Sequence, residues 1–243
     1  MPWHAVPGGF VHRAEATARL VQNGNVGTLA RLGWDTFFGA AHMVLLKLEL
    51  ERFRDKHLQR FSLAARPVEP RDMPVFFSLS DQAATPRSRC DVARRLFMLQ
   101  AGIKTCYVVE DSRGEARFLQ WLILPSENER LTEVYGKWYP TLRPEEAMIE
   151  HAYVLPQYRG SGLLPCAVSR VLRIARASGV RQIVTFIPTW NKNSLNSFMR
   201  LGFTPYQERT DRKFFGVRFR QAHPIVHLSA RHGCAPAQRS PSL

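Results

Sequence analysis

One stretch of the chain, residues 149–163, places carboxylate, imidazole and phenol side chains directly before a basic, glycine-containing turn. Its first seven residues are rich in β-branched and aromatic types, which predicts a strand. Pro156 ends that strand because proline cannot donate a ladder hydrogen bond. Gly160 and Gly162 allow a tight turn and a close approach of backbone to a ligand. Apolar residues then recur every three or four positions, which predicts an amphipathic helix over 163–178 whose first amides would receive a phosphate.

The surrounding sequence alternates between the two periodicities of regular structure. Residues 90–102 have helical spacing, with Gly102 as a C-terminal stop. The turn-rich residues 111–114 are expected to connect two strands as a hairpin. The stretch 125–146 is polar and is expected to be a connection. Strands are predicted at 44–51, 61–68, 104–110, 116–124, 181–187, 206–211 and 213–219.

Two motifs in this order resemble those of a known superfamily. Gln157-Tyr158-Arg159-Gly160-Ser161-Gly162 is similar to the Gln/Arg-x-x-Gly-x-Gly/Ala loop of the GCN5-related N-acetyltransferases, which holds the pyrophosphate of acetyl-coenzyme A. Asn191, Ser194 and Gly202-Phe203 match the second motif, Asn-x-x-Ala/Ser-x-x-x-Tyr-x-x-x-Gly-Phe, with the expected helix and strand between the two. The resemblance covers residues 61–219 and implies an α/β fold: a mixed, mostly antiparallel central sheet with helices on both faces.

The resemblance implies an acyl-coenzyme A-dependent N-acyltransferase that passes acetyl from acetyl-CoA to an amine by direct attack. Catalysis at such a site depends mainly on positioning. A neutral amine must approach the thioester carbonyl, and a hydrogen-bond donor must stabilise the oxyanion that develops there. The pantetheine arm would enter between the strands that carry Val154 and Ile187. The residues expected to bind acetyl-CoA are Tyr153, Val154, Leu155, Gln157, Arg159, Gly160, Ser161, Gly162, Leu163, Asn191 and Ser194, and no metal is expected.

A protonated amine acceptor must lose a proton before it attacks, and Glu150 is the first candidate for the base. Strand alternation sends Glu150, Ala152 and Val154 to one face and His151, Tyr153 and Leu155 to the other. If the acceptor lies on the second face, His151 or Tyr153 replaces Glu150. The alternatives are a packed strand histidine at position 151 and a reaction without a dedicated base.

Phe198 is a departure from the family pattern. It stands where many relatives have the tyrosine that protonates the departing thiolate, and phenylalanine has no proton to give. Water or Tyr206 would have to supply that proton. The change leaves open a second function, a catalytically degenerate acyl-CoA-binding protein with a regulatory or scaffold role.

The composition sets limits on compartment and partners. A formal net charge of +14 predicts attraction to polyanions, but the sequence has no repeated basic-aromatic module or zinc-finger spacing, which argues against nucleic acid. Peripheral membrane contact and a homodimer both stay open. Four cysteines without Cys-x-x-Cys spacing suit a reducing cytoplasm, and no secretory signal or spanning helix is expected.

The chain is expected to divide into an N-terminal extension, a catalytic domain and a disordered tail, at residues 1–60, 61–228 and 229–243. The aromatic residues of the extension either touch a membrane or acyl group or pack on the domain; they are Trp34, Phe37 and Phe38, together with Met43. By the same resemblance, in which the segments around the strand at 149–155 line the acceptor site, the polar connection supplies weak acceptor-binding candidates, for which an ordinary solvated loop is the alternative: Glu127, Glu129, Glu133, Trp138 and Tyr139.

Overall fold

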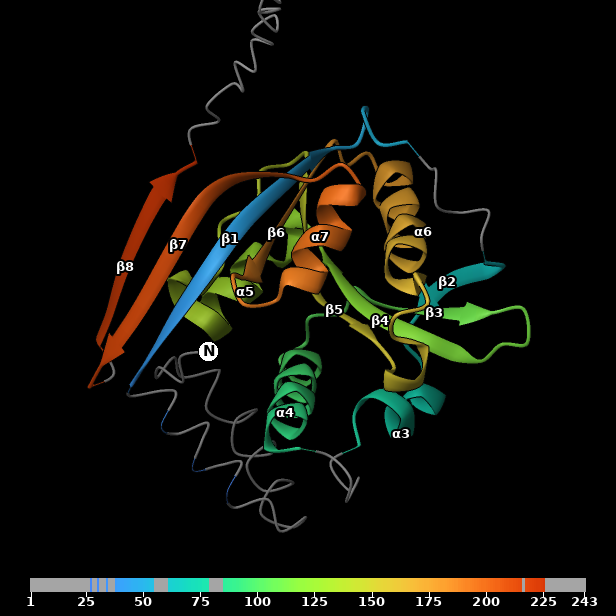
Figure 1. Cartoon of the computed structure of the whole chain (residues 1–243), viewed down its shortest axis with the longest axis horizontal. Helices are drawn as coiled ribbons and strands as arrows, with labels where there is room; N and C mark the ends of the chain where they lie inside the picture. The colour runs from blue at the N-terminus through green and yellow to red at the C-terminus, as the bar shows by residue number, and fades with distance from the viewer. Residues whose placement is uncertain are drawn as a thin grey trace, which may run out of the picture.

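The computed structural model describes residues 27, 30, 34, 38–54, 61–78, 85–215 and 217–225. These residues form an eight-stranded sheet with the order β2-β3-β4-β5-β6-β1-β7-β8 (Figure 1). Every neighbouring pair is antiparallel except β5 and β6, which are parallel, so the predicted mixed, mostly antiparallel sheet is confirmed. The strands are β1 (Gly39–Glu49), β2 (Leu63–Pro67), β3 (Cys106–Asp111), β4 (Ala116–Ile123), β5 (Glu146–Val154), β6 (Gln182–Pro188), β7 (Thr204–Phe214) and β8 (Val217–Pro224).

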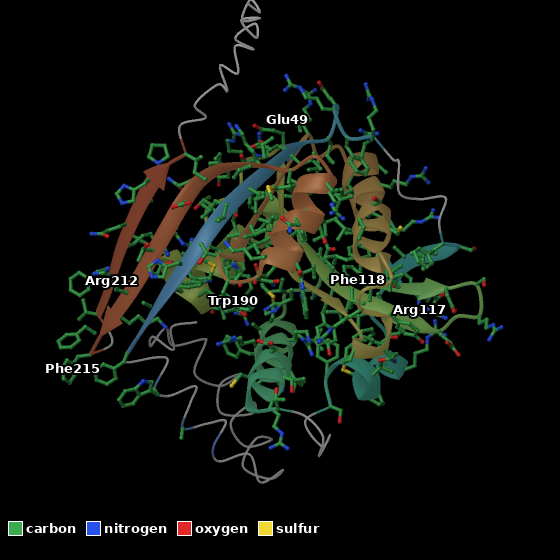
Figure 2. All side chains as sticks on the ribbon, in the orientation of Figure 1. Glu49, Arg117, Phe118, Trp190, Arg212 and Phe215 are labelled. Atoms are coloured by element: carbon green, nitrogen blue, oxygen red, sulfur yellow. The ribbon has the colours of Figure 1, made fainter. Side chains whose placement is uncertain are left out.

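Helices cover both faces of this sheet. One face packs on three helices through a core that includes Trp121, and the other packs on two helices through a core that includes Phe118, labelled in Figure 2. The first group is α3 (Met73–Phe76), α4 (Pro86–Gln100) and α5 (Asn128–Tyr135), and the second is α6 (Leu163–Ala177) and α7 (Lys192–Arg200). Single 3-10 turns lie at η1 (Pro70–Asp72), η2 (Pro125–Glu127), η3 (Gly136–Trp138) and η4 (Pro156–Tyr158).

Local sequence signals explain where the helices begin and end. The Thr85 side chain accepts a hydrogen bond from the Ser88 amide at the start of α4, and Asn191 accepts one from Ser194 at the start of α7. These are N-caps that satisfy amides without a helical partner. Gly102 follows α4 with a φ of 78°, the left-handed conformation that the predicted stop requires.

Residues 125–146 were expected to be a polar connection, and this prediction is wrong. They contain α5, η2 and η3, and both Trp138 and Tyr139 are buried, at 4% and 6% exposure. The apolar side chains of α5 fall on one side of the helix, where Leu131 and Val134 join the core beside α4. Sequence periodicity is hard to detect in a helix of only eight residues.

The turn of the C-terminal hairpin lies later in the sequence than predicted. The turn was expected near residue 212, yet β7 continues to Phe214 because Arg212 and Lys213 pair with Ala40 and Gly39 of β1. Phe214 then pairs with Val217 across the turn. The pairing with the long strand β1 therefore extends β7 beyond its predicted end at residue 211.

Strand β1 lies inside the sheet, although its residues belong to the predicted extension 1–60. It pairs with β6 on one side and with β7 on the other, and Leu46 and Leu48 enter the core beneath α6 and α7. Part of the extension is thus integral to the domain, since β1 joins the two halves of the sheet. Phe37 and the predicted tail 229–243 lie outside the described residues. Within the described residues, no helix is long and apolar enough to cross a membrane.

We expect Leu46→Ala to lower the free energy of unfolding by about 2–5 kcal/mol, because it removes a fully buried side chain from the strand that joins β6 to β7. Urea denaturation measures the change. Val75→Ala, at a side chain that is 46% exposed, is the matched control and should change stability little. Equal stability of Leu46→Ala and the wild type would show that β1 is dispensable.

Candidate active site

The site begins where β5 and β6 separate. Their parallel pairing covers only three residue pairs and ends at Met148 and Val184. Just beyond that point the Thr185 hydroxyl donates a hydrogen bond of 3.0 Å to the Ile149 carbonyl. The remaining residues of the two strands diverge, so a gap opens between the carboxyl ends of β5 and β6.

A β-bulge shapes β5 beside this gap. Leu119 of β4 pairs with Tyr153, while Trp121 pairs with Glu150, so β5 has one residue more than β4 over this interval. His151 takes up the extra length with a φ of 50°, a left-handed conformation that is uncommon for residues other than glycine. Strain of this kind persists where the surrounding structure enforces it, and it is frequent at functional sites.

The bulge overturns the predicted alternation of side chains. Ala152 and Val154 pack under α6, and Tyr153 and Leu155 pack on the opposite face. Glu150 was expected on the same face of the strand as Ala152 and Val154. It lies instead on the face that carries Met148 and Trp121, because the extra residue reverses the alternation between positions 150 and 152.

The Glu150 carboxyl group is largely withdrawn from water, with 13% of its side chain exposed. Burial raises its pKa to about 8, while the nearby Arg209 and Arg94 guanidinium groups oppose this shift. The desolvation of the charged carboxylate therefore outweighs the attraction of two cations. A carboxyl group with this pKa exchanges protons near neutral pH.

His151 has the opposite shift. Burial lowers its pKa to about 3, and Arg95 and Arg94 lower it further. Its Nε2 atom lies 3.9 Å from Glu150 Oε1, and its ring meets the edge of Trp121 at a centroid distance of 5.7 Å. The imidazole is therefore neutral at physiological pH and too weakly basic to compete with Glu150 for a proton.

Polar atoms without a hydrogen-bond partner in the described structure gather around Glu150. They are Tyr139 Oη, His151 Nε2 and Arg209 Nη2, from three different segments of the chain. Burial and the neighbouring Glu150 raise the pKa of Tyr139, so its hydroxyl keeps its proton. Buried polar groups are rarely left unpaired. These atoms can therefore receive the polar groups of an acceptor or ordered water.

Arg209 is held in place from several sides. Its guanidinium lies 5.0 Å from the ring centroids of both Trp138 and Phe186, and its Nε is 2.8 Å from Asp211 Oδ2. The flanking rings and the carboxylate leave the side chain 5% exposed. Arg209 thus fixes a positive charge near Glu150 on a rigid part of the sheet.

The glycine loop joins β5 to α6. Gly160 and Gly162 have φ values of 77° and 83°, and a Cβ atom at Gly160 would meet nothing within 4 Å. The Ser161 hydroxyl donates to the Tyr158 carbonyl at 2.7 Å, which fixes the turn. α6 starts directly afterwards at Leu163. The first amides of α6 follow this exposed turn directly, an arrangement that can receive an anion.

Arg159 folds back from this loop onto β5. Its Nε donates to the Val154 carbonyl at 3.2 Å, and its guanidinium lies 5.4 Å from the Tyr153 ring centroid. Arg95 covers the same ring at 4.0 Å and donates two hydrogen bonds to the Phe76 carbonyl. The Tyr153 ring therefore contacts the guanidinium groups of Arg95 and Arg159. These contacts connect α3, α4 and the loop to β5.

The backbone of Val154 is directed toward the gap. The Leu155 amide donates to Arg117 of β4, and successive residues of a strand direct their backbone groups to opposite edges. Val154 must then turn its N–H and C=O toward β6, in agreement with the Arg159 hydrogen bond to its carbonyl. The side chains of Leu155 and Leu163 belong to the two cores.

The second motif forms the other wall. Asn191 caps α7 through its side-chain oxygen, which accepts from the Ser194 amide at 3.3 Å. Phe198 is 2% exposed and packs against Phe203 at a centroid distance of 5.1 Å. Tyr206 lies near Lys47, Glu146 and Arg209.

Comparison with known proteins agrees with the fold described above. Residues 62–204, more than half of the chain, match the acetyltransferase (GNAT) domain. The chain belongs to the GNAT acetyltransferase family. Members of this family use acetyl-CoA as co-substrate, and this chain has the mixed sheet with helices expected of the GNAT fold.

The curated GNAT relatives cover a smaller region. Thialysine N-epsilon-acetyltransferase of Mus musculus is 32% identical over 101 residues, 38% of this chain and 59% of that protein. The Bos taurus protein of the same name is 29% identical over 101 residues. The chain therefore spans less than two thirds of the length of these relatives.

A solved structure supports the fold. A GCN5-related glucosamine N-acetyltransferase region in a fungal multi-domain GH3 beta-N-acetylglucosaminidase aligns with a TM-score of 0.52 and 12% identity. The alignment covers 82% of this chain and 23% of that chain. At this identity the likeness concerns the GNAT fold alone.

The five acceptor candidates in residues 125–146 divide into two groups. Tyr139 lies beside Glu150, and Trp138 supports Arg209. The glutamates are not brought to the site: Glu127 accepts from the Lys104 and Thr105 amides, Glu133 pairs with Arg130, and Glu129 is exposed on α5. The solvated-loop alternative is therefore wrong for the two aromatic residues.

Sequence reasoning missed Arg209 and Arg95. Arg209 belongs to a strand that is distant in sequence from both motifs, and no local signal marks it. Arg95 carried a weak signal, since it lies among the apolar residues of α4 and yet is 2% exposed. A charged residue on the buried side of a helix indicates a paired or functional group.

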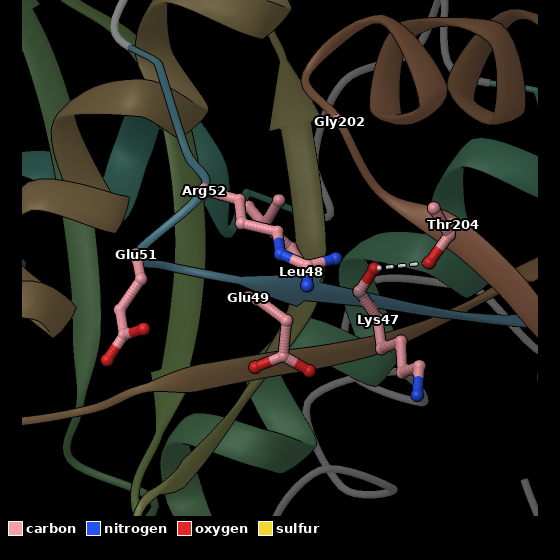
Figure 3. Close-up of a pocket in the computed structure, with 7 residues that line it drawn as sticks. All are labelled: Lys47, Leu48, Glu49, Glu51, Arg52, Gly202 and Thr204. Atoms are coloured by element: carbon pink, nitrogen blue, oxygen red, sulfur yellow. Dashed lines mark hydrogen bonds between the residues drawn. The ribbon is translucent and has the colours of Figure 1, made fainter.

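A separate hollow of ≈ 460 Å³ lies at the other end of the sheet (Figure 3). Lys47, Glu49 and Thr204 are among its lining residues, and the Thr204 hydroxyl donates to the Lys47 carbonyl at 3.4 Å. Glu49 pairs with Gln182 at the start of β6, whereas the gap opens at the end of that strand. This hollow is therefore distant from the gap between β5 and β6.

We expect the stability of Glu150→Gln relative to the wild type to rise with pH. The folded wild type keeps the Glu150 proton up to about pH 8, whereas the unfolded chain loses it near pH 4.3. Wild-type stability therefore falls between these values, and the variant should gain about 2–4 kcal/mol on the wild type from about pH 5 to about pH 9.

Urea denaturation at both pH values gives this difference. Glu51→Gln, at an exposed residue, is the control and should follow the wild type. Parallel pH curves for Glu150→Gln and the wild type would show that Glu150 titrates normally.

Proposed function

We propose that the protein is an N-acyltransferase that moves acetyl from acetyl-CoA to an amine by direct attack. The observation that carries this proposal is the position of Glu150, a buried carboxyl group with a raised pKa beside the gap between β5 and β6. The glycine loop at the mouth of the same gap supplies an anion site for the coenzyme. A positioned base and a phosphate cradle are the two components that this transfer needs.

The proposed binding roles follow from the geometry. Amides from Gly160 to Leu163 would hold the pyrophosphate, aided by the charge of Arg159, with Gln157 and Ser161 on the exposed turn. The Val154 amide, directed into the gap, would donate to the pantetheine arm or to the developing oxyanion. Asn191 already uses its side-chain oxygen as a cap, so its amide group would contact the arm.

Glu150 would take the proton from the acceptor amine. The amine nitrogen then forms a bond to the acetyl carbonyl carbon, and the bond between that carbon and sulfur breaks. Tyr139 and Arg209 lie near Glu150 and would orient the acceptor or a bridging water. The neutral His151 would contribute shape and the backbone bulge and would take no part in proton transfer.

The thiolate would take its proton from solvent. Phe198 is buried and has no proton to donate, and burial raises the pKa of Tyr206, which makes its phenol a weaker acid. This arrangement requires water at the site, which the unpaired polar atoms around Glu150 would hold.

The acceptor is proposed to be a primary amine. The curated relatives are named for transfer to the ε-nitrogen of thialysine, so thialysine and lysine belong in the first panel of acceptors. We place the protein in the cytoplasm, where the buried side chains of Cys90, Cys106 and Cys166 remain thiols. A homodimer remains a proposal from the family resemblance.

We expect Glu150→Gln to lower kcat by about 10²–10⁴-fold, because it removes the general base. The wild-type kcat/KM should rise with pH to a bend near pH 8, and the variant should lose this bend. Thiol release from acetyl-CoA measures both. Glu51→Gln is the control, and unchanged turnover in Glu150→Gln would remove Glu150 from the mechanism.

We expect Gly160→Glu to weaken acetyl-CoA binding at least tenfold, because the new carboxylate would repel the pyrophosphate and the residue would strain the turn. Gly114→Glu is a matched control, since Gly114 has a φ of 76° and nothing within 4 Å of its Cβ position. It lies in the hairpin between β3 and β4, so it should reproduce the strain and keep the affinity. Calorimetric titration gives both affinities.

Equal binding by the two glycine variants would place the coenzyme elsewhere. Normal acetyl-CoA binding by the wild type with no turnover on any amine would instead favour the alternative function, a non-catalytic acyl-CoA-binding protein.

A further inference from the structure

Exposed apolar side chains gather at the turn between β7 and β8. Most of the largest exposed apolar side chains of the described residues lie here, with exposures of 58% to 68%. Figure 2 shows Phe215 at the end of the hairpin, with Arg212 close by. We call this surface the aromatic tip; it consists of Trp34, Phe38, Phe214, Phe215, Val217 and Phe219.

The rings of the aromatic tip pack on one another. Phe38 lies 4.8 Å from Trp34 and 5.2 Å from Phe215, and Phe214 lies 4.7 Å from Phe215, all as centroid distances. Segments far apart in the sequence therefore build one continuous apolar surface. Contiguous exposed patches of this kind mark interaction sites, whereas scattered exposed residues do not.

The backbone conformation that exposes part of the aromatic tip lowers the stability of the fold. Phe215 has a φ of 47° and an exposure of 68%. A bulky residue in the left-handed region is an outlier, and tight hairpin turns prefer glycine or asparagine there. Because the Phe215 ring is mostly in solvent, core packing does not explain the choice of residue.

Basic residues are frequent in the sequence of the β7–β8 hairpin that carries the aromatic tip. Residues 209–220 contain one acidic residue, Asp211, whose carboxylate is 2.8 Å from both Arg209 and Arg220. Arg212 is exposed, and Lys213 pairs with Gly39, the first residue of β1. The basic residues of this segment are Arg209, Arg212, Lys213, Arg218 and Arg220. Arg209 is buried beside Glu150 and Arg220 pairs with Asp211, so Arg212 and Lys213 supply the positive charge next to the exposed aromatic rings.

We propose that the aromatic tip docks on an anionic lipid surface, with its rings in the headgroup region and its basic residues on the phosphates. Aromatic side chains favour the membrane interface, and each basic residue near an anionic leaflet adds attraction. The formal net charge of +14 strengthens this attraction over a longer range.

The charge and ring geometry disfavour two other partners. In a symmetric dimer the same patch meets itself, which would bring Arg212 and Lys213 close to their own copies. Single-stranded nucleic acid needs free ring faces on which bases can stack. Here Phe214 and Phe215 meet at an interplanar angle of 85°, so the rings use their faces and edges on each other.

The docked orientation would bring the candidate active site toward the lipid. Met43 of β1 pairs with Pro188 at the open end of β6, and four residues earlier Gly39 pairs with Lys213 beside the aromatic tip. The tip and the gap between β5 and β6 therefore lie at the same end of the sheet. Trp190, 62% exposed, follows β6 at this end.

Sedimentation with lipid vesicles tests the proposal with the full chain. We expect binding to phosphatidylcholine vesicles that contain phosphatidylserine, weaker binding to phosphatidylcholine alone, and a steep loss of binding with salt. The double variant Phe214→Ser with Phe215→Ser should bind at least about tenfold more weakly, and Arg212→Glu about fivefold more weakly. Val75→Ser, at an exposed apolar residue on α3, is the control and should bind as the wild type does.

Circular dichroism and acetyl-CoA turnover without lipid should be unchanged in all variants, which separates docking from folding and catalysis. Absence of binding at low salt, or equal binding by the double Phe variant, would overturn the proposal. A dimer that forms without lipid and is lost in the double Phe variant would assign the surface to self-association. Binding to single-stranded oligonucleotides but not to vesicles would assign it to nucleic acid.

Discussion

The short parallel pairing of β5 and β6 is the constraint on which the rest of the site depends. Three residue pairs hold the strands together, and Thr185 closes the last hydrogen bond before they separate. The backbone of Val154 can then face a gap in place of a neighbouring strand. The glycine loop and the start of α6 lie at the mouth of that gap because they directly follow β5.

The β-bulge at His151 changes the acid–base properties of the residues beside the gap. One extra residue moves Glu150 onto the face that carries Trp121 and the residues near α4, where burial raises its pKa to about 8. The same burial lowers the pKa of His151 to about 3. Burial thus shifts the pKa values of two adjacent titratable groups in opposite directions, and their order in the sequence does not decide which one can act as base.

The sequence predicted the parts of the fold that have strong local signals. The glycines at 160 and 162, the Gly102 stop and the apolar period of α6 each act within a few residues, so their structures could be read without the rest of the chain. The weak predictions concerned tertiary packing. The α5 region was too short for a clear period, and β1 showed its strand pattern but gave no sign of its place between β6 and β7.

The sequence by itself determined the glycine turn before α6, the order of the two motifs and the family, because each depends on residue types at fixed spacing. Only the tertiary structure decided which face Glu150 occupies, since a bulge depends on the register with β4. It also decided that Arg209 and Tyr139 join Glu150, and that rings from residues 34 to 219 form one surface. Contacts between distant segments follow from strand order, which local spacing does not encode.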